Sequence, residues 1–135
     1  MADQRFVSDH HCVFKLTYHV IFVTKFRRKC LTGCILQDLY IFLLEYSKKL
    51  NLSIHEVNGE SDHVHFILEA RPTDKLSNVI GSLKASSTSF LYSKGYKFPY
   101  WGNLSRTLWS SGYFICSTGG VSIEILKQYI QIHFL

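Results

Sequence analysis

Apolar residues recur at two different spacings along this chain, and the order in which the spacings alternate restricts the fold more than any other feature. In Leu16–Val23 alternate side chains are apolar, and β-branched and aromatic residues predominate, which predicts a strand. Residues 35–50 place apolar side chains three or four positions apart, a spacing typical of an amphipathic helix. Repeated switching between the two patterns predicts helices packed on a sheet.

Further elements follow from the same reasoning. Asn58-Gly59 is a turn signal, so the strands on either side of it are expected to form an antiparallel hairpin. The resulting order, β-α-β-β-α-β-β-α, predicts an α+β fold of ferredoxin-like (RRM-like) character, with helices packed on a mainly antiparallel sheet. We expect these additional strands at 52–57, 63–69, 106–109 and 113–118, and these additional helices from Thr73 to before Gly95 and at 123–134.

We expect one domain covering residues 1–135, because no linker, repeat or low-complexity segment divides the chain. Hydrophobic residues make up 47% of it, which is enough for a core and unlike a disordered chain. No apolar run is long enough to span a bilayer and the N-terminus lacks a signal sequence, so we expect a cytoplasmic protein with no membrane partner. The four cysteines lack the spacing of a metal site and are interpreted as free thiols.

Two histidines share one face of the strand expected at 63–69. His63 and His65 alternate with Val64 and Phe66, so the imidazoles point to one side and the apolar residues point to the core. Two adjacent imidazoles can supply half of a divalent metal site. Two partly exposed strand histidines with no ligand explain the same pattern.

The expected C-terminal helix offers a third ligand and a nucleophile. Tyr129 and His133 are four positions apart, which puts them one turn apart on the same helical face. If this helix packs across the histidine strand, His133 completes a three-ligand site and Tyr129 lies beside the metal. The simpler alternative is a surface tyrosine with no catalytic role.

Four parts of the chain together resemble a known family. In their order and spacing they are similar to the small single-tyrosine HUH transposases (TnpA) of insertion sequences of the IS200 class, within the Rep/relaxase-like HUH endonuclease superfamily. The resemblance covers nearly the whole chain. The parts that carry it are Tyr18–Lys29, Asp62–Leu68, Trp109–Phe114 and Tyr129.

The resemblance implies a transposase that cuts single-stranded DNA beside hairpin ends and rejoins strands without a nucleotide cofactor. Tyr129 would be the nucleophile, forming a 5′-phosphotyrosine link and releasing a 3′-OH. The ligands of a divalent metal, Mg²⁺ or Mn²⁺, would be His63, His65 and His133. Family members commonly have glutamine where His133 stands, so the imidazole is expected to make Mn²⁺ at least as effective as Mg²⁺. Asp62 either orients a ligand or caps the turn.

Single-stranded DNA is the expected partner, and a homodimer is the expected assembly. The aromatic residues that alternate with lysines between Tyr92 and Trp101 either stack on bases or belong to the core. The resemblance also implies that the tyrosine helix can act in the partner subunit, with Gly119-Gly120 as either a hinge or a plain turn. The basic residues expected to contact phosphates are Lys25, Arg27, Arg28, Lys29 and Lys84.

A non-catalytic RRM-like nucleic-acid-binding module is the alternative from another functional class. Such a module has no need for His63, His65 and Tyr129 together, and the sequence lacks its usual aromatic motif. A HUH nuclease domesticated to act on chromosomal repeats is a closer alternative. Hairpin-forming DNA beside the gene would indicate a mobile element instead.

Overall fold

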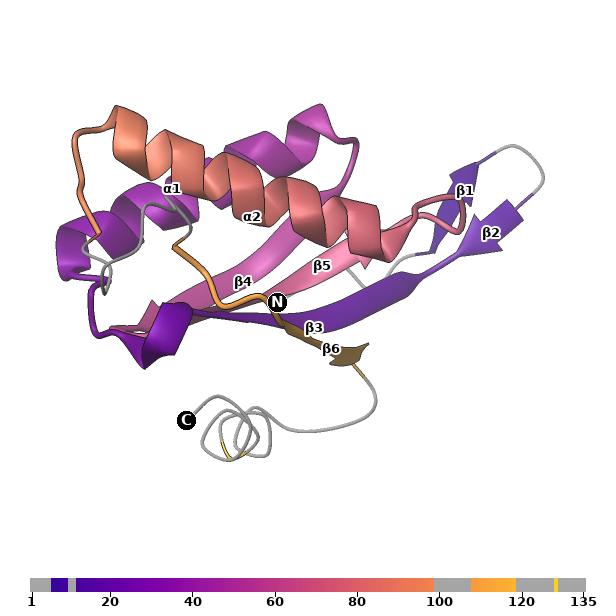
Figure 1. The fold of residues 1–135 in the computed structure, drawn as a ribbon. Coiled ribbons are helices and arrows are strands. Elements are labelled where there is room, and N and C mark those ends of the chain that lie inside the picture. Colours follow the sequence, from indigo (N-terminus) through magenta and orange to yellow (C-terminus); the bar gives the residue numbers. More distant parts are fainter. Residues whose placement is uncertain (1–5, 10–11, 99–107, 119–127, 129–135) are drawn as a thin grey trace.

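The computed structural model describes residues 6–9, 12–98, 108–118 and 128. Among them a four-stranded sheet carries two helices on one face, and a two-stranded ribbon lies beyond one end of that sheet (Figure 1). The elements are, in chain order, β1 Val7–Asp9, β2 Cys12–Phe14, β3 Leu16–Val23, the short 3-10 helix η1 Lys25–Arg27, α1 Gly33–Lys49, β4 Ser53–Glu60, β5 His63–Ala70, α2 Leu76–Ser93 and β6 Phe114–Ser117.

The four-stranded sheet has the order β4-β5-β3-β6. β3 and β5 are its central strands and pair antiparallel over their full lengths, from Leu16 opposite Ala70 to Val23 opposite His63. β4 and β6 flank them, also antiparallel. This topology confirms the predicted α+β class, an antiparallel sheet with helices packed on it.

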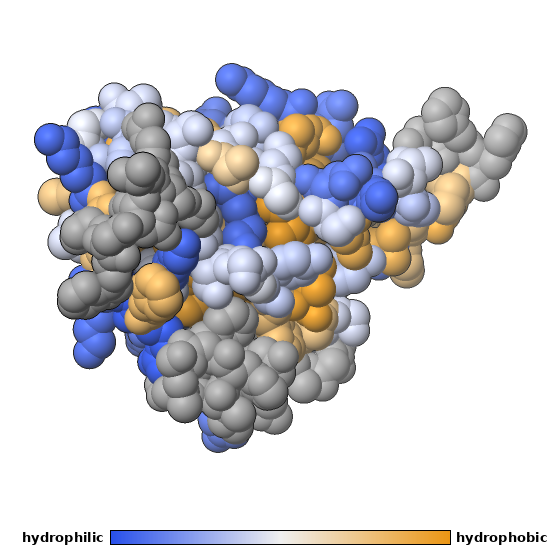
Figure 2. Space-filling model, viewed as in Figure 1, coloured by the Kyte–Doolittle hydropathy of each residue, from blue (hydrophilic) through white to orange (hydrophobic). Residues whose placement is uncertain are grey.

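The core fills the space between the helices and the sheet. Figure 2 shows hydrophobic residues gathered where these two layers meet. Burial of each such side chain contributes about 1.5–3 kcal/mol, so β3 and β5 are firmly held along their inner face. The buried side chains include Val20 and Phe22 from β3, Val64, Phe66 and Leu68 from β5, Leu39 and Leu43 from α1, and Ile80, Leu83 and Leu91 from α2.

The turn between β4 and β5 lies further along the chain than the sequence predicts. Asn58 and Gly59 belong to β4, and residues 61–62 make the turn. The strand is longer than expected because it contains a bulge before Asn58, where Glu56 adopts a φ of 51°. A Cβ at Gly59 would lie 2.6 Å from the carbonyl oxygen of His63. This glycine therefore permits the close approach of β5 and does not form the turn.

The two described helices were predicted with different accuracy at their first residues. α1 begins two residues before the predicted position, whereas α2 begins at Leu76 and not near Thr73. The N-cap position is occupied by Lys75, which makes no side-chain capping bond. Instead the Asp74 carboxylate accepts a 2.7 Å hydrogen bond from the backbone N–H of Arg71, which stabilises the turn before the helix.

The remaining elements differ from the prediction mainly where segments are short. β6 confirms the strand expected at 113–118. Of the strand expected at 106–109, residues 106–107 lie outside the described residues, and Trp109 forms an isolated bridge with Thr24. The β1–β2 ribbon was not predicted, since three-residue strands show no periodicity. The helix expected at 123–134 lies outside the described residues apart from Gln128.

Two further expectations concern thiols and membranes. All four cysteines are free thiols, with Cys12 and Cys34 exposed and Cys30 and Cys116 partly buried. Within the part of the chain that the structure describes, neither helix is both long and apolar enough to cross a bilayer.

Candidate active site

The two strand histidines lie together on the sheet face opposite the helices. His63 and His65 have ring centroids 6.0 Å apart and ring planes inclined by 23°. Val64 and Phe66 point the other way and are fully buried in the core. The sequence-based assignment of faces on β5 is therefore confirmed, and the inner residues hold the strand in place.

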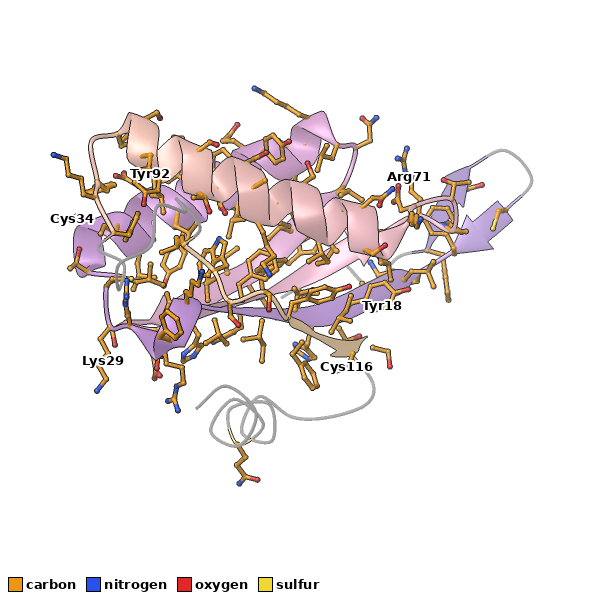
Figure 3. The ribbon with its side chains drawn as sticks, viewed as in Figure 1. Tyr18, Lys29, Cys34, Arg71, Tyr92 and Cys116 are labelled. Atoms are coloured by element: carbon orange, nitrogen blue, oxygen red, sulfur yellow. The ribbon has the colours of Figure 1, made fainter. Side chains whose placement is uncertain are left out.

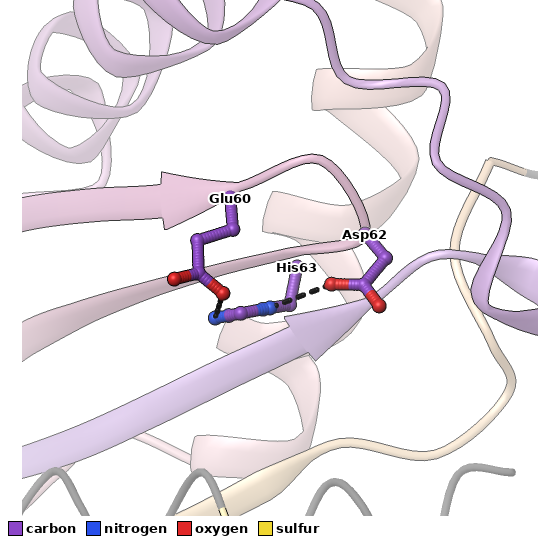
Figure 4. A group of neighbouring side chains, drawn as sticks. All are labelled: Glu60, Asp62 and His63. Atoms are coloured by element: carbon purple, nitrogen blue, oxygen red, sulfur yellow. Dashed lines mark hydrogen bonds and ion pairs between the residues drawn. The ribbon is translucent and has the colours of Figure 1, made fainter.

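The two nitrogens of His63 have different surroundings (Figure 4). Nδ1 lies 2.8 Å from Oδ1 of Asp62, so in the neutral form of the ring Nδ1–H is the donor to that carboxylate and the lone pair is on Nε2. Nε2 is buried and has no hydrogen-bond partner among the described residues. Oε2 of Glu60 lies 3.8 Å from it. An oriented imidazole with an unshared, buried nitrogen has the form of a metal-ligating histidine.

Asp62 connects His63 to the basic segment, residues 25–29, that follows β3. Its Oδ2 accepts two 3.3 Å hydrogen bonds from the guanidinium of Arg27, while its backbone carbonyl accepts one from the amide of Thr24 at 2.9 Å. Burial alone would raise the pKa of Asp62, but the hydrogen bond from His63 and the charge of Arg27 outweigh it and lower that pKa. Asp62 thus stays ionised and fixes the ring of His63.

The basic segment itself adopts an unusual backbone conformation. Phe26 and Arg27 have positive φ angles of 59° and 51°, which are costly for residues with a Cβ and persist where the surroundings fix them. Here the fixing contacts are the Asp62–Arg27 pair and the hydroxyl of Thr24, which donates to the carbonyl oxygen of Arg28 at 2.7 Å. Strain held in this way is typical of functional segments.

This conformation exposes an aromatic ring between two cations. Phe26 is 63% exposed, with Nζ of Lys25 at 5.8 Å and Cζ of Arg28 at 5.5 Å from its ring centroid. Lys29 is also exposed and extends away from the body of the protein (Figure 3). The guanidinium of Arg27 is paired with Asp62. The sequence analysis named the cations and missed Phe26, whose exposure depends on the left-handed backbone.

Lys84, which the sequence analysis expected to contact DNA phosphates, belongs to α2 and not to the basic segment after β3. Its ammonium donates to the carbonyl oxygens of Ser110 at 2.6 Å and Gly112 at 3.1 Å, and burial lowers its pKa. It lines a cavity of about 410 Å³ together with Trp109 and Ser110. In this structure Lys84 holds the 110–112 segment against α2.

Two of the aromatic residues considered for base stacking pack within the fold. Tyr92 makes an edge-on contact with Phe98, with centroids 5.5 Å apart. The hydroxyl of Tyr96 donates to Asp38 at 2.6 Å, which raises the pKa of Tyr96 to about 12. These contacts favour the core interpretation for both residues.

Several predicted residues lie outside the described part of the chain. These are Tyr129 and His133 of the expected terminal helix, the Gly119-Gly120 pair, and the aromatic residues Tyr100 and Trp101. Conversely, Glu60 was not predicted as a site residue, since the turn expected at Asn58-Gly59 excluded it from the strand.

Comparison with known proteins gives a consistent family. The model of the family described as "Transposase IS200 like" matches residues 12–133. The transposase of insertion sequence element IS200 from Salmonella typhimurium is 29% identical over 133 residues, covering 97% of this chain and 84% of the relative. The ISDra2 transposase TnpA of Deinococcus radiodurans is 26% identical over 121 residues, covering 88% of this chain and 84% of its own length.

Solved structures agree with these sequence matches. A Deinococcus radiodurans R1 protein described as a transposase superposes with a TM-score of 0.77 at 26% identity, covering 93% of this chain and 94% of that one. A REP-associated tyrosine transposase bound to a REP hairpin gives a TM-score of 0.55 at 13% identity, covering 96% of this chain and 76% of the other. The second likeness concerns the fold alone.

Proposed function

The chain belongs to the family of IS200-like transposases, and from that premise we propose that it cuts and rejoins single-stranded DNA with the help of a divalent metal ion bound at His63 and His65. The observation that carries the proposal is the pair of adjacent imidazoles, in which His63, whose buried Nε2 has no hydrogen-bond partner among the described residues, lies beside His65. A fixed imidazole with a free lone pair is the expected state of a ligand before its ion arrives.

The proposed ion is Mg²⁺ or Mn²⁺, and the imidazole donors favour Mn²⁺. His63 and His65 supply imidazoles, and His133 is proposed as a further ligand from the terminal helix. Once bound, such an ion would polarise the scissile phosphate and stabilise the charge that develops on it. The part of Asp62 is to hold His63 in the tautomer with Nε2 unprotonated, since a protonated imidazole cannot bind a metal.

Tyr129 is the proposed nucleophile. Its phenolate oxygen would attack the phosphorus atom, forming a 5′-phosphotyrosine bond as the bond from phosphorus to the 3′-oxygen breaks. The departing 3′-oxygen takes up a proton and becomes a 3′-OH. A 3′-OH of this kind later attacks a second phosphotyrosine link, regenerating the tyrosine and joining two strands, so no nucleotide cofactor is required.

The proposed DNA contacts start with the basic segment beside the histidines. Lys25, Arg28 and Lys29 can neutralise phosphates, whereas the exposed ring of Phe26 can stack on an unpaired base. Arg27 and Lys84, also predicted as phosphate contacts, would have to share their hydrogen bonds with the protein groups they now hold. Hairpin ends as targets, a homodimer and a single domain over residues 1–135 remain part of the proposal.

The alternative of a non-catalytic nucleic-acid-binding module is less consistent with the surroundings of His63 and His65. A module that only binds nucleic acid gains nothing from placing two imidazoles side by side with a carboxylate that orients one of them. A domesticated nuclease would keep the same chemistry, and only the DNA flanking the gene separates it from a mobile element.

The proposal is tested by looking for DNA attached to the protein. Labelled single-stranded DNA covering the flanks of the gene is incubated with the protein and Mn²⁺ or Mg²⁺, and a denaturing protein gel is examined for label. We expect a metal-dependent adduct that is lost in Tyr129→Phe. Tyr113→Phe, which removes another hydroxyl, serves as the matched control and should keep it. DNA that is bound by folded, metal-supplied protein but never attached would contradict the proposal.

A further inference from the structure

Arg27 belongs to the basic segment, but its side chain contacts the turn that leads into the histidine strand. Its Nε and Nη2 each donate a 3.3 Å hydrogen bond to Oδ2 of Asp62. The side chain of Arg27 is 21% exposed and that of Asp62 is 10% exposed. Hydrogen bonds between a charged donor and a carboxylate are stronger than those between neutral groups, so this pair holds the carboxylate firmly.

The two oxygens of Asp62 have different partners. Oδ2 accepts the hydrogen bonds from Arg27, whereas Oδ1 lies 2.8 Å from Nδ1 of His63 (Figure 4). Rotation of the carboxylate about its bond to Cβ would break one of these contacts or the other. Arg27 therefore limits the orientations in which Asp62 can meet the imidazole.

The backbone around Arg27 is attached to the same turn. The amide of Thr24 donates to the carbonyl oxygen of Asp62 at 2.9 Å, and the amide of Leu31 donates to that of Ser61, also at 2.9 Å. The basic segment is thus joined to the turn on both sides of Arg27. Arg27 itself has a φ of 51°, which is costly for a residue with a Cβ. The surroundings hold it in the conformation from which its side chain reaches Asp62.

Pairing with Asp62 also makes Arg27 a poor contact for a DNA phosphate. The carboxylate neutralises the guanidinium, so the pair has no net charge with which to displace the counterions of DNA. Turning Arg27 toward DNA would leave the buried carboxylate of Asp62 without its cation, which costs free energy. Lys29, in contrast, is exposed and extends away from the body of the protein (Figure 3).

We propose that Arg27 is a positioning residue, which holds Asp62 against His63 and does not bind a DNA phosphate. The inference rests on the proposed function in one respect, because a fixed His63 serves the reaction only if the reaction takes place there. It gives Arg27 a different role from the one that the run of basic residues predicts. The positioning itself belongs to the free protein and is measured without metal or DNA.

NMR of the metal-free protein labelled with ¹⁵N-histidine reports the hydrogen bond of His63. A buried Nδ1–H held by a carboxylate exchanges slowly with water and gives a proton signal, which is assigned by its loss in His63→Ala. We expect this signal in the wild type and in the matched control Lys29→Met. It should be lost in Arg27→Met and in the more polar Arg27→Gln. Arg27→Lys, which keeps a cation beside Asp62, should restore part of it.

The salt dependence of DNA binding tests the second half of the proposal. Affinity for labelled oligothymidylate is measured without metal over a range of salt concentrations. Loss of one phosphate contact lowers the slope of log K against log salt by about 0.7 for single-stranded DNA. We expect that decrease in Lys29→Met, whereas Arg27→Met should keep the slope of the wild type.

The outcomes separate this inference from the proposed function. If Arg27→Met and Arg27→Gln, folded by circular dichroism, keep the His63 signal, or if they lower the salt slope as Lys29→Met does, the inference is wrong. It is also wrong if the wild type lacks the signal. None of these results decides whether DNA becomes attached to the protein. A wild type that shows the expected signal and slope but forms no adduct would contradict the proposed function alone.

Discussion

The β4–β5 hairpin carries a histidine–glutamate pair near each end, and the two pairs differ in the charges around them. Near the turn, His63 lies between the carboxylates of Glu60 and Asp62. Toward the other end, Nε2 of His55 lies 3.6 Å from Oε1 of Glu69, and that oxygen also accepts a 2.7 Å hydrogen bond from Lys15.

The charges around the two pairs explain why we propose a metal ion at His63 and not at His55. Both Nε2 atoms are buried and lack hydrogen-bond partners among the described residues, so an unpartnered nitrogen alone does not identify a metal site. At Glu69 the ammonium of Lys15 neutralises the carboxylate and would repel a metal ion. At His63 the nearby cation, Arg27, is paired with Asp62 on the Nδ1 side of the ring, whereas Nε2 faces Glu60 and the ring lies beside that of His65.

Replacing each histidine in turn should have the largest effect. We expect His63→Ala to lower Mn²⁺ affinity on the order of a hundredfold or more, because it removes a donor, whereas His55→Ala should leave the affinity unchanged. Isothermal titration calorimetry of the two variants provides the measurement. Equal loss in both variants would mean that the two pairs are equivalent and that the comparison is wrong.

The second prediction concerns the stability of the Lys15 end. Lys15 and Glu69 are both 15% exposed in their side chains, so Lys15→Met leaves a largely buried carboxylate without its cation. We expect the free energy of unfolding in urea to fall by about 1–3 kcal/mol, with Mn²⁺ binding unchanged. Lys29→Met, at an exposed position, is the matched control and should unfold as the wild type does. A Lys15→Met variant that is fully stable but binds an additional Mn²⁺ would instead make this end a second site.

The third prediction, with the smallest expected effect, concerns Asp62 and how the free energy of unfolding of the metal-free protein changes with pH. The folded pKa of Asp62 lies below its ordinary value of 3.8, so this carboxylate contributes stability that is present above pH 3.8 and is lost as the pH falls through the folded pKa. Asp62→Asn should therefore lose less stability than the wild type over that acid range. Urea unfolding at pH 5 and at about pH 3 tests this, and parallel losses in both proteins would show that Asp62 is not stabilised by His63 and Arg27.

The sequence predicted most of what depends on alternation and helical spacing. The faces of β5, the approximate extents of α1 and β6, and the placement of Asp62 beside His63 all follow from local pattern. These features are local because a strand or helix repeats the same geometry from one residue to the next.

What the sequence did not predict depends on contacts between segments. Glu60 lies opposite His63 because a bulge in β4 moves the turn past Gly59, and no single-strand pattern specifies a bulge. The pairing of Arg27 with Asp62 likewise needs the left-handed backbone at Phe26 and Arg27. A run of basic residues therefore looked uniform in sequence although one of its members is bound to the site itself.

The central claim is that a divalent metal is bound at His63 through an imidazole nitrogen, and pulsed electron paramagnetic resonance of Mn²⁺-loaded protein tests it most directly. In protein labelled with ¹⁵N-histidine we predict nitrogen couplings from directly bound imidazole that persist in His55→Ala and disappear or diminish in His63→Ala. Mn²⁺ that is bound by the wild type without any histidine coupling, or whose coupling survives unchanged in His63→Ala, would contradict the account.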